Sequence, residues 1–393
     1  MVLAVNGNIL RPTPDGYYNL QLDAFMHKRL YLLTSQTFDL SLFRGEWYLY
    51  RGPAPTVFIL PFYLIFGIKA SSILYTFLAA CGNIALFYLL IKECKKYFHI
   101  GLSFFSEIFL VLSFCFASSN LPLGIIGGTW STSTEQVVAV FYLLLFYLFY
   151  FKWLGNIRNV WMLFVAVLFF NLAWLSRYTM IFHGVLFLYP FFIGKFHEKR
   201  VALKQFFIIG IFIGVCICGD FLYNYARFNN PFETGLRYHH GSKRYAQVIA
   251  SHKFFDISYA PGNLYYYFLN IPQFLSHKPF VKIDEEGNSI FVVYPAILLL
   301  VFLAKSRYLR EQKIKKFLVF AGVVIILTLS VLMVCFATGW VQFGNRYFFD
   351  IQPLVYVLLI FVMQDISLFV LIPMLVYEIS VNIAGTVNFL HIS

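Results

Sequence analysis

Long apolar runs dominate the sequence after residue 70, and short polar segments separate them. Ten of these runs reach or approach the roughly 17–25 residues that an α-helix needs to cross a bilayer. They predict membrane-spanning helices near 71–91, 103–119, 136–151, 160–176, 178–194, 205–225, 289–304, 317–338, 347–363 and 367–390. The pattern therefore predicts an all-α polytopic integral membrane protein with about ten transmembrane helices.

The first 70 residues have a different pattern, because acids and aromatic residues are interspersed through them. They end in the apolar stretch PAPTVFILPFYLIFG (53–67), which is too short and too rich in proline to cross. It predicts an interfacial or re-entrant helix. We therefore divide the chain into a loop with interfacial helices (1–70) and a transmembrane helical domain (71–393) that contains one long polar loop (226–288).

Basic residues follow every second predicted span, at 92–96, 152–158, 195–204 and 305–316. The positive-inside rule places such loops in the cytoplasm. The remaining loops then face outward, and they include residues 1–70 and the long loop 226–288. An N-terminal segment with several basic residues is costly to translocate alone. We therefore expect a further transmembrane helix upstream of Met1, or that the chain is a fragment.

Composition supports a membrane protein, since 60% of the residues are hydrophobic and only 12% are charged, against about 25% charged in soluble domains. The net charge of +12 lies in the short loops, which is typical of topology signals and of attraction to anionic lipid, so we exclude nucleic acid as a partner. The six cysteines show no zinc-ligand spacing. A soluble nucleotide-sugar enzyme is disfavoured because no glycine-rich phosphate loop is present.

Four segments, in this order, resemble bacterial GT-C glycosyltransferases of the protein-mannosyltransferase/aminoarabinose-transferase type. The first is PDGYYNLQLDAFMHKRLYL (14–32), followed by LFRGEWYLYRGPAPTVFILPFYLIFG (42–67). The others are LSRYTM (175–180), YNYARFNNPFETGLRY (223–238) and FGNRYFFDIQPL (343–354). The sequence departs from the family pattern at Tyr178, where proline is usual, and at Asn229, where glycine is usual.

The resemblance implies a GT-C-like fold with its active site at the outer leaflet of the bacterial cytoplasmic membrane. It implies a glycosyltransferase that moves a sugar, with inversion, from a polyprenyl-phosphate-linked donor to a lipid, glycan or protein acceptor. Residues 1–70 then form the catalytic loop.

Two carboxylates are candidates for catalysis. Asp15 is the candidate base that takes the proton of the acceptor hydroxyl, or else the N-cap of the following helix. Glu135 is the candidate second carboxylate, which positions the acceptor or helps bind a divalent cation, or else an acid in the first turn of a helix. Asp23 lies two helical turns after Asp15, either at the substrate or on a solvated helix face. Asp39 and Glu46 are interpreted as turn and surface residues.

The candidate substrate-binding residues are arginines and aromatics. Arg177, Arg227 and Arg346 are candidates for binding the phosphate of the donor, because a guanidinium donates paired hydrogen bonds. The alternatives are snorkelling at the interface for Arg177 and Arg346 and a pair with Glu233 for Arg227. The expected lining of the sugar or lipid cleft consists of Tyr17, Tyr18, Trp47 and Tyr347.

Two other functions fit the same sequence. A transporter or flippase of lipid-linked or anionic substrates predicts charges along a path at mid-membrane, whereas here most charges lie near the outer edge. An inactive, truncated relative of the family is the other alternative.

Overall fold

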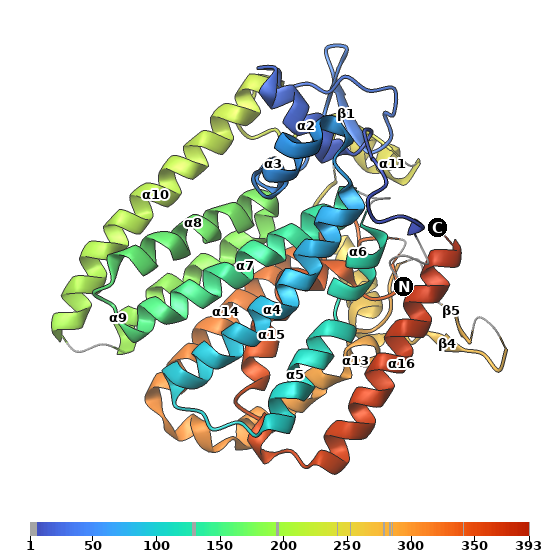
Figure 1. Cartoon of the computed structure of the whole chain (residues 1–393). Helices are drawn as coiled ribbons and strands as arrows, with labels where there is room; N and C mark the ends of the chain where they lie inside the picture. The colour runs from blue at the N-terminus through green and yellow to red at the C-terminus, as the bar shows by residue number, and fades with distance from the viewer. Residues whose placement is uncertain are drawn as a thin grey trace.

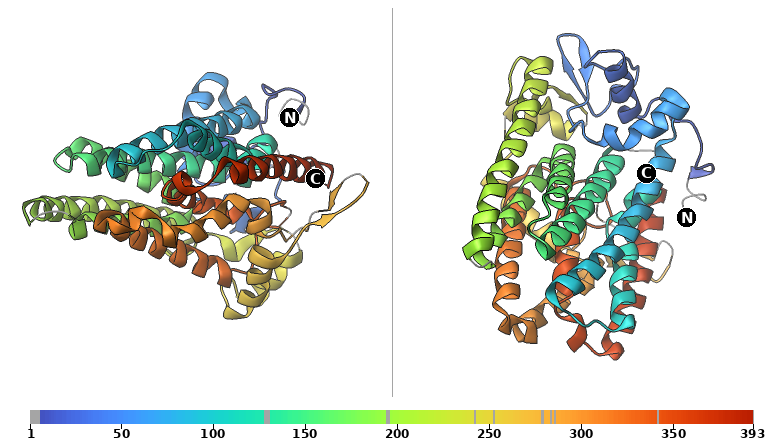
Figure 2. Two further views of the ribbon diagram at one scale, coloured as in Figure 1. Left: turned by 90° about the horizontal axis from the view of Figure 1, so that it is seen from below. Right: turned by 60° about the vertical axis from the view of Figure 1, so that its left-hand side comes forward.

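A computed structural model provides the structure, which describes residues 6–127, 131–193, 196–241, 243–251, 253–277, 280–282, 284, 286–340 and 342–392. Most of these residues form helices that run along one long axis as an elongated bundle (Figure 1). A smaller layer lies across one end of the bundle (Figure 2, right). We call this layer the N-terminal cap (residues 6–70) and the end of the bundle beside it the cap end.

The N-terminal cap combines two short helices with a β-hairpin. Gly45 lies in the hairpin turn with φ 84°, a left-handed conformation that glycine adopts without strain. A short strand from the long segment after helix α10 (Phe196–Phe228) pairs with the free edge of the hairpin, with Ser41 opposite His239. The elements are α2 (Tyr17–Met26), β1 (Leu40–Phe43), β2 (Glu46–Tyr48), α3 (Pro55–Phe66), η1 (Gly67–Lys69) and the pairing strand β3 (His239–His240).

The first part of the bundle consists of apolar helices that run alternately away from the cap and back toward it. Polar residues mark the positions where these helices begin. Ser71, Ser103 and Asn159 each accept, through the side chain, a hydrogen bond from a backbone N–H of the first turn. The elements are α4 (Ser72–Phe98), α5 (Phe104–Phe116), α6 (Asn120–Ile126), α7 (Ser131–Gly155), α8 (Val160–Ser176), η2 (Tyr178–Leu188) and α9 (Tyr189–Ile193).

The long helix α10 (Phe196–Phe228) returns to the cap end, where a segment of short elements follows. Asn263 fixes this segment to the end of helix α14 (Gln312–Val334), because its side-chain amide donates hydrogen bonds to the carbonyls of Leu332, Met333 and Cys335. Besides β3, the segment contains η3 (Leu236–Tyr238), α11 (Lys243–Ser251), η4 (Ile257–Tyr259), α12 (Ala260–Leu264), the π-helix η5 (Tyr265–Leu269), β4 (Gln273–Phe274) and β5 (Val281–Lys282).

The remaining helices complete the bundle and end near the N-terminal cap (Figure 1). Pro295 begins a 3-10 helix directly after a short α-helix, and 3-10 helices lie on both sides of the α-helix at 352–359, so the α-helical parts of these two runs are short. The elements are α13 (Ile290–Val293), η6 (Pro295–Lys305), η7 (Arg307–Arg310), α14 (Gln312–Val334), η8 (Arg346–Asp350), α15 (Gln352–Leu359), η9 (Met363–Asp365) and α16 (Leu368–Ile392).

The apolar helices confirm the prediction of a mainly helical membrane protein. Among the residues that the structure describes, five helices are long and apolar enough to cross a membrane, or six if the bent pair α5 and α6 is one span. They are Ser72–Phe98, Ser133–Gly155, Leu203–Phe228, Gln312–Val334 and Leu368–Val387. The runs predicted at 160–176, 178–194 and 289–304 form shorter apolar helices, and the run at 347–363 forms η8 and α15. The number of about ten spans therefore stays a prediction.

The helices differ in how deeply they are packed. In α7, 72% of the apolar window is buried inside the molecule, whereas in α10 the share is 11%. The core around α7 is rich in aromatic contacts, for example the stacked rings of Phe87 and Phe114, whose centroids lie 4.4 Å apart. α7 is therefore the central helix, and α10 presents most of its apolar surface outward.

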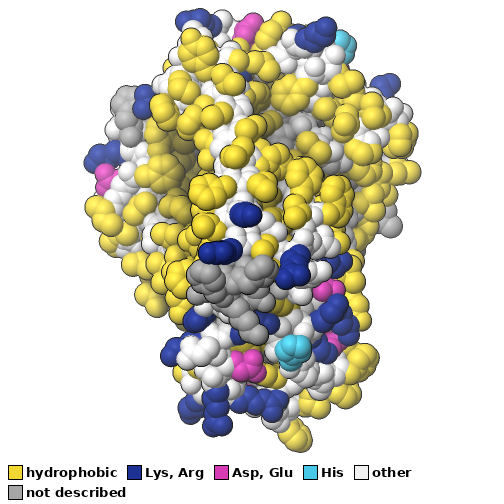
Figure 3. Space-filling view, turned by 90° about the vertical axis from the view of Figure 1, so that its left-hand side faces the viewer, with side chains coloured by type: hydrophobic (Ala, Val, Ile, Leu, Met, Phe, Trp, Pro, Cys, Tyr) yellow, Lys and Arg dark blue, Asp and Glu magenta, His cyan; other side chains and the backbone are white. Residues whose placement is uncertain are grey.

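The face that carries α10 is covered largely by hydrophobic side chains (Figure 3). Lysine and arginine side chains gather toward the end that lies away from the N-terminal cap (Figure 3). Lys96, Arg158 and Lys315 belong to the loops and helix ends there. We call this end the basic end.

Candidate functional site

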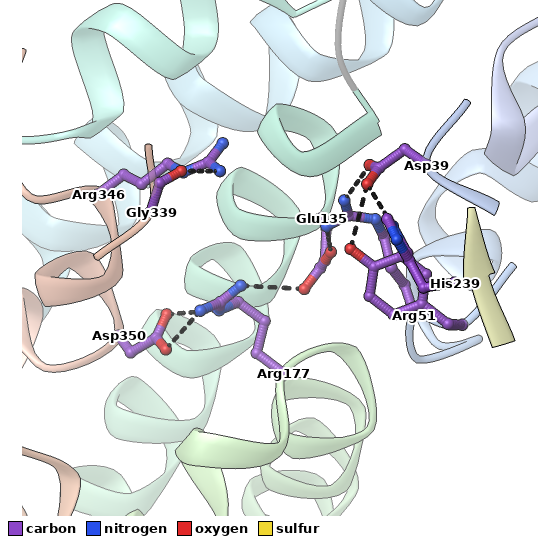
Figure 4. A network of polar contacts seen from close by, with 9 residues as sticks. Asp39, Arg51, Glu135, Arg177, His239, Gly339, Arg346 and Asp350 are labelled. Atoms are coloured by element: carbon purple, nitrogen blue, oxygen red, sulfur yellow. Dashed lines mark hydrogen bonds and ion pairs between the residues drawn. The ribbon is translucent and has the colours of Figure 1, made fainter. Parts of the chain in front are cut away.

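Five charged residues alternate in sign at the cap end and form one continuous chain of ion pairs (Figure 4). Arg51 donates to Asp39 at 2.5 Å and to Glu135 at 2.6 Å. The other oxygen of Glu135 accepts from Arg177 at 3.0 Å. Arg177 also donates to Asp350 through Nε at 2.7 Å and Nη2 at 3.0 Å, which is a bidentate pair. We call these five residues the charged network.

The charged network joins parts of the chain that are far apart in sequence. Arg51 follows β2, Glu135 lies in the first turns of α7, Arg177 ends α8 and Asp350 ends η8. Gly52 allows the approach between the first and third of these segments. A Cβ at Gly52 would lie 1.9 Å from the carbonyl oxygen of Leu175, so only glycine lets the cap lie directly against the end of α8.

Both ends of the charged network are held by further hydrogen bonds. Thr179 donates to Asp350 at 2.5 Å. A ring nitrogen of His183 lies 3.0 Å from the Asp350 carbonyl. At the other end, Nε2 of His239 lies 2.8 Å from Asp39. The long segment after α10 is thereby joined to the hairpin through a polar contact as well as through β3.

The environment of Asp39 and Arg51 favours their charged forms. Burial by itself raises the pKa of Asp39, but the adjacent Arg51 and His239 outweigh this effect and hold that pKa well below its usual range. Burial likewise lowers the pKa of Arg51, but Tyr50, Asp39 and Glu135 outweigh it. The pair is therefore ionised across the physiological range, and Asp39 is a poor proton acceptor.

The structure brings several of the predicted site residues together. Glu135 and Arg177 are members of the charged network. The guanidinium of Arg177 lies 5.0 Å from the ring centroid of Tyr347, and that of Arg346 lies 5.5 Å from it. Tyr18 is buried beside the same charges. Its burial and the nearby Glu135 raise the pKa of its hydroxyl well above the usual range. These five residues therefore surround one place at the cap end.

Polar atoms without a hydrogen-bond partner are concentrated around the charged network. Nη2 of Arg346 donates to the Gly339 carbonyl (Figure 4), whereas its Nε and Nη1 are buried without a partner among the described residues. The hydroxyls of Tyr18 and Ser133 and the amide of Gln136 are in the same situation. Buried polar groups are normally hydrogen-bonded, so this concentration is suited to a polar ligand that supplies acceptors to Arg346.

Asp15 lies outside the charged network. It is exposed in the turn before α2, and no hydrogen bond or ion pair joins it to another residue that the structure describes. Gly16, not Asp15, is the N-cap of α2, and no side chain caps this helix. The turn is anchored by Thr13, whose hydroxyl donates to the Ala70 carbonyl at 3.0 Å and accepts from the Ser72 amide at 2.8 Å. Asp15 is therefore at the cap end, on its exposed rim.

The other predicted residues have contacts of their own. Asp23 accepts hydrogen bonds from Arg29 at 3.1 Å and Tyr63 at 2.8 Å. Trp47 packs edge-on against His240. The hydroxyl of Tyr17 donates to the Phe38 carbonyl, and burial together with Asp39 raises its pKa to about 12.

Arg227 is buried at the end of α10 and does not pair with Glu233. It donates to the Leu49 carbonyl and to Asn224, both at 2.6 Å. Glu233 instead lies 3.4 Å from Arg237. Arg227 therefore fastens the cap to α10.

Sequence reasoning missed three residues of the charged network. Asp39 was expected at the surface, but it is mostly buried and joins Arg51 to His239. Arg51 was counted only as a basic residue of the N-terminal segment. Asp350 lies within a run predicted to span the membrane, and its side chain is fully buried. An acid inside an apolar run is a signal that favours a functional or paired role, and it marks Asp350.

The expected role of Glu135 in binding a divalent cation does not fit the residues present. Each carboxylate oxygen of Glu135 already accepts from a guanidinium, and a cation in that place would face two arginines. Within the described ranges, no group of three or more His, Cys, Asp or Glu side chains is placed to hold a metal ion.

Comparisons with known proteins give a fold but no family. No family model and no curated protein matches this sequence. The structure is similar to the crystal structure of the Archaeoglobus fulgidus oligosaccharyltransferase in its apo form, with a TM-score of 0.53 and 14% sequence identity. The similarity covers 97% of this chain and 52% of that protein, so the chain spans about half the length of the archaeal enzyme. The chain thus shares its fold with this oligosaccharyltransferase, whereas membership of the GT-C glycosyltransferases and the bacterial mannosyltransferase-like subtype stay predictions.

Proposed function

We propose that this protein is a membrane glycosyltransferase that transfers a sugar from a polyprenyl-phosphate-linked donor to an acceptor at the outer membrane face. One observation carries the proposal. A buried chain of alternating carboxylates and guanidinium groups lies at the cap end, and beside it Arg346 has two buried nitrogen atoms without a partner among the described residues. The fold shared with the archaeal oligosaccharyltransferase supports the same function.

In this proposal Arg346, rather than Arg177, provides the principal contact to the donor phosphate. Three nitrogen atoms of Arg177 already donate to Glu135 and Asp350. The role of Arg177 is therefore to hold the charged network and the ring of Tyr347 in place. Arg346 has free donors that match a phosphate group, and a fixed donor is most effective where negative charge develops on the leaving group.

Asp15 is the proposed base. A base must be free to accept a proton, but Asp39, Glu135 and Asp350 are all held by arginines. Asp15 has no such partner among the described residues. The acceptor hydroxyl gives its proton to Asp15 while its oxygen bonds to the anomeric carbon. The bond from that carbon to the phosphate oxygen breaks on the opposite face, and polyprenyl phosphate leaves with the electron pair, which inverts the anomeric carbon.

The remaining residues have supporting roles in the proposal. Glu135 positions Arg51 and Arg177 instead of reacting. Tyr17, Tyr18 and Trp47 line the cleft for the sugar or the lipid, and Tyr18 contributes its buried hydroxyl as a hydrogen-bond donor. Asp23 and Arg227 hold the N-terminal cap together, as their contacts indicate.

A sugar-transfer assay tests the proposal. The full chain is reconstituted in liposomes with radiolabelled polyprenyl-phosphate sugars and a membrane extract as the source of acceptor. We expect Asp15→Asn and Arg346→Gln each to lower transfer by about a hundredfold or more without loss of folded protein. Asp256→Asn is the matched control, because asparagine keeps the hydrogen bond that Asp256 accepts from the Ser258 amide.

The same liposomes separate the proposal from its alternatives. Transfer that proceeds normally in Asp15→Asn would exclude Asp15 as the base. Movement of a labelled lipid or anion across the bilayer without transfer would support a transporter or flippase. Neither transfer nor transport by the unaltered chain with any donor offered would support an inactive relative.

A further inference from the structure

A second candidate binding site lies at the basic end, away from the charged network. The last residues of η6 and the turn that leads into α16 enclose a pocket of about 340 Å³. Its lining combines apolar side chains with one cation, one anion and one hydroxyl. The lining residues are Phe302, Lys305, Asp365, Ile366, Ser367 and Val370.

The two opposite charges in this pocket do not neutralise each other. No ion pair or hydrogen bond joins the side chains of Lys305 and Asp365 to one another or to other described residues, and both residues are exposed. Lys92 and Lys95 at the same end behave differently, because both pair with Glu107. A pocket with separate, unpaired charges of both signs is suited to a ligand that itself carries both.

The start of α16, where Ser367 lines the pocket, also favours binding of a phosphate near Lys305. Ser367 precedes α16, and its hydroxyl accepts from the Phe369 amide at 3.3 Å. Ser367 and Val370 both line the pocket, so the first turn of this 25-residue helix borders it, and a helix N-terminus carries partial positive charge. Lys305 and the start of α16 together form the positive side, and Asp365 forms the negative side.

Apolar surface continues from the pocket along both helices. Val301 on η6 is 72% exposed and Phe302 is 44% exposed, while Val370 on α16 is 46% exposed. η6 and α16 contact each other, so these side chains border a shared seam. α16 is one of the helices long and apolar enough to cross a membrane. An acyl chain beside such a helix lies in the hydrocarbon environment of the bilayer.

We propose that this pocket binds a zwitterionic phospholipid whose headgroup has a primary ammonium, of the phosphatidylethanolamine class. The lipid phosphate binds between Lys305 and the start of α16. The ammonium donates hydrogen bonds to Asp365, and one acyl chain lies along the apolar seam. The position at the basic end corresponds to the cytoplasmic leaflet in the predicted topology. A phosphatidylcholine headgroup has the same charges but no N–H to donate, and a phosphatidylglycerol headgroup has no cation.

Lipid retention measures this selectivity. The full chain is purified in detergent, exposed to equal amounts of phosphatidylethanolamine, phosphatidylcholine and phosphatidylglycerol, and analysed by native mass spectrometry. We expect phosphatidylethanolamine to be retained about two- to fivefold more than either of the others, the range of a half-exposed ion pair. Lys305→Gln should lower its retention by a similar factor. Asp365→Asn should abolish the preference over phosphatidylcholine.

Lys315→Gln removes another exposed lysine from the basic end, outside the pocket, and should leave the preference unchanged. Preferred retention of phosphatidylglycerol that Asp365→Asn does not alter would show general attraction of anionic lipid instead. Equal retention of all three lipids, or retention that Lys305→Gln does not change, would also overturn the proposal. Melting temperatures of the variants confirm that each is folded.

Discussion

The two ends of the bundle use charge in opposite ways. In the charged network at the cap end the side chains are paired and largely buried, and in Glu135, Arg177 and Asp350 only 7%, 10% and 0% of the side chain is exposed. At the basic end lysines and arginines lie on exposed loops, and even the paired Lys92 is 44% exposed. The charged network has a carboxylate partner for each of its arginines, whereas the basic end has an excess of cations.

The charges of the charged network contribute to the structure and to the proposed chemistry, whereas the charges of the basic end are predicted topology signals. Buried ions lose their hydration and are tolerated only when partners replace it. The charged network is therefore coupled to the packing of the cap, α7, α8 and η8. The basic loops keep their water, so each charge there contributes little to stability. By the positive-inside rule their collective sign predicts a cytoplasmic position.

The largest effect is expected from breaking the charged network at its centre. Arg177→Leu leaves Glu135 with one partner fewer and Asp350 buried without a counter-ion. We expect a loss of about 3–5 kcal/mol of stability, measured by thermal denaturation of the detergent-solubilised protein. Arg310→Leu, an exposed arginine of the basic end, should change stability by less than about 0.5 kcal/mol. Similar losses in both variants would remove the contrast between the two ends.

A smaller effect should appear in the pH dependence of stability. The pKa of Asp39 is held below its unfolded value, so its contribution is present above the unfolded pKa of about 4 and is lost as the pH falls through the folded value. Asp39→Asn should therefore lower stability near neutral pH by about 2 kcal/mol and flatten the decline in acid. Melting temperatures measured from pH 7 down to pH 2 give the acid slopes of Asp39→Asn and of the unaltered chain. An unchanged acid slope would show that other carboxylates carry it.

The smallest effect is expected from the ion pairs of the basic end. Glu107 accepts from both Lys92 and Lys95, and these lysines are partly exposed to solvent. Glu107→Gln should cost about 1 kcal/mol or less, and added salt should reduce the difference from the unaltered chain. Thermal denaturation at low and high salt provides the measurement. A loss of stability as large as that of Arg177→Leu would contradict the expected difference between the ion pairs of the two ends.

Parts of the candidate site were predictable from local sequence. Glu135 and Arg177 stand out because each is charged and lies between long apolar runs. Arg346 lies in the glycine-bearing segment 343–354, one of the four segments that resemble the transferase family. Arg51 and Asp39 have no such signal, since the N-terminal segment contains many charged residues and the sequence pattern does not distinguish the paired ones.

The apolar pattern by itself determined that the chain forms a bundle of helices suited to a membrane, because helix formation and burial in lipid depend on the composition of a single run. The loop charges likewise predict an orientation in the membrane. Only the tertiary structure decided that Asp39, Arg51, Glu135, Arg177 and Asp350 form one chain of ion pairs. Such pairing depends on distances between residues up to 173 positions apart, as Arg177 and Asp350 are, and close approaches such as that of Gly52 to Leu175 fix those distances.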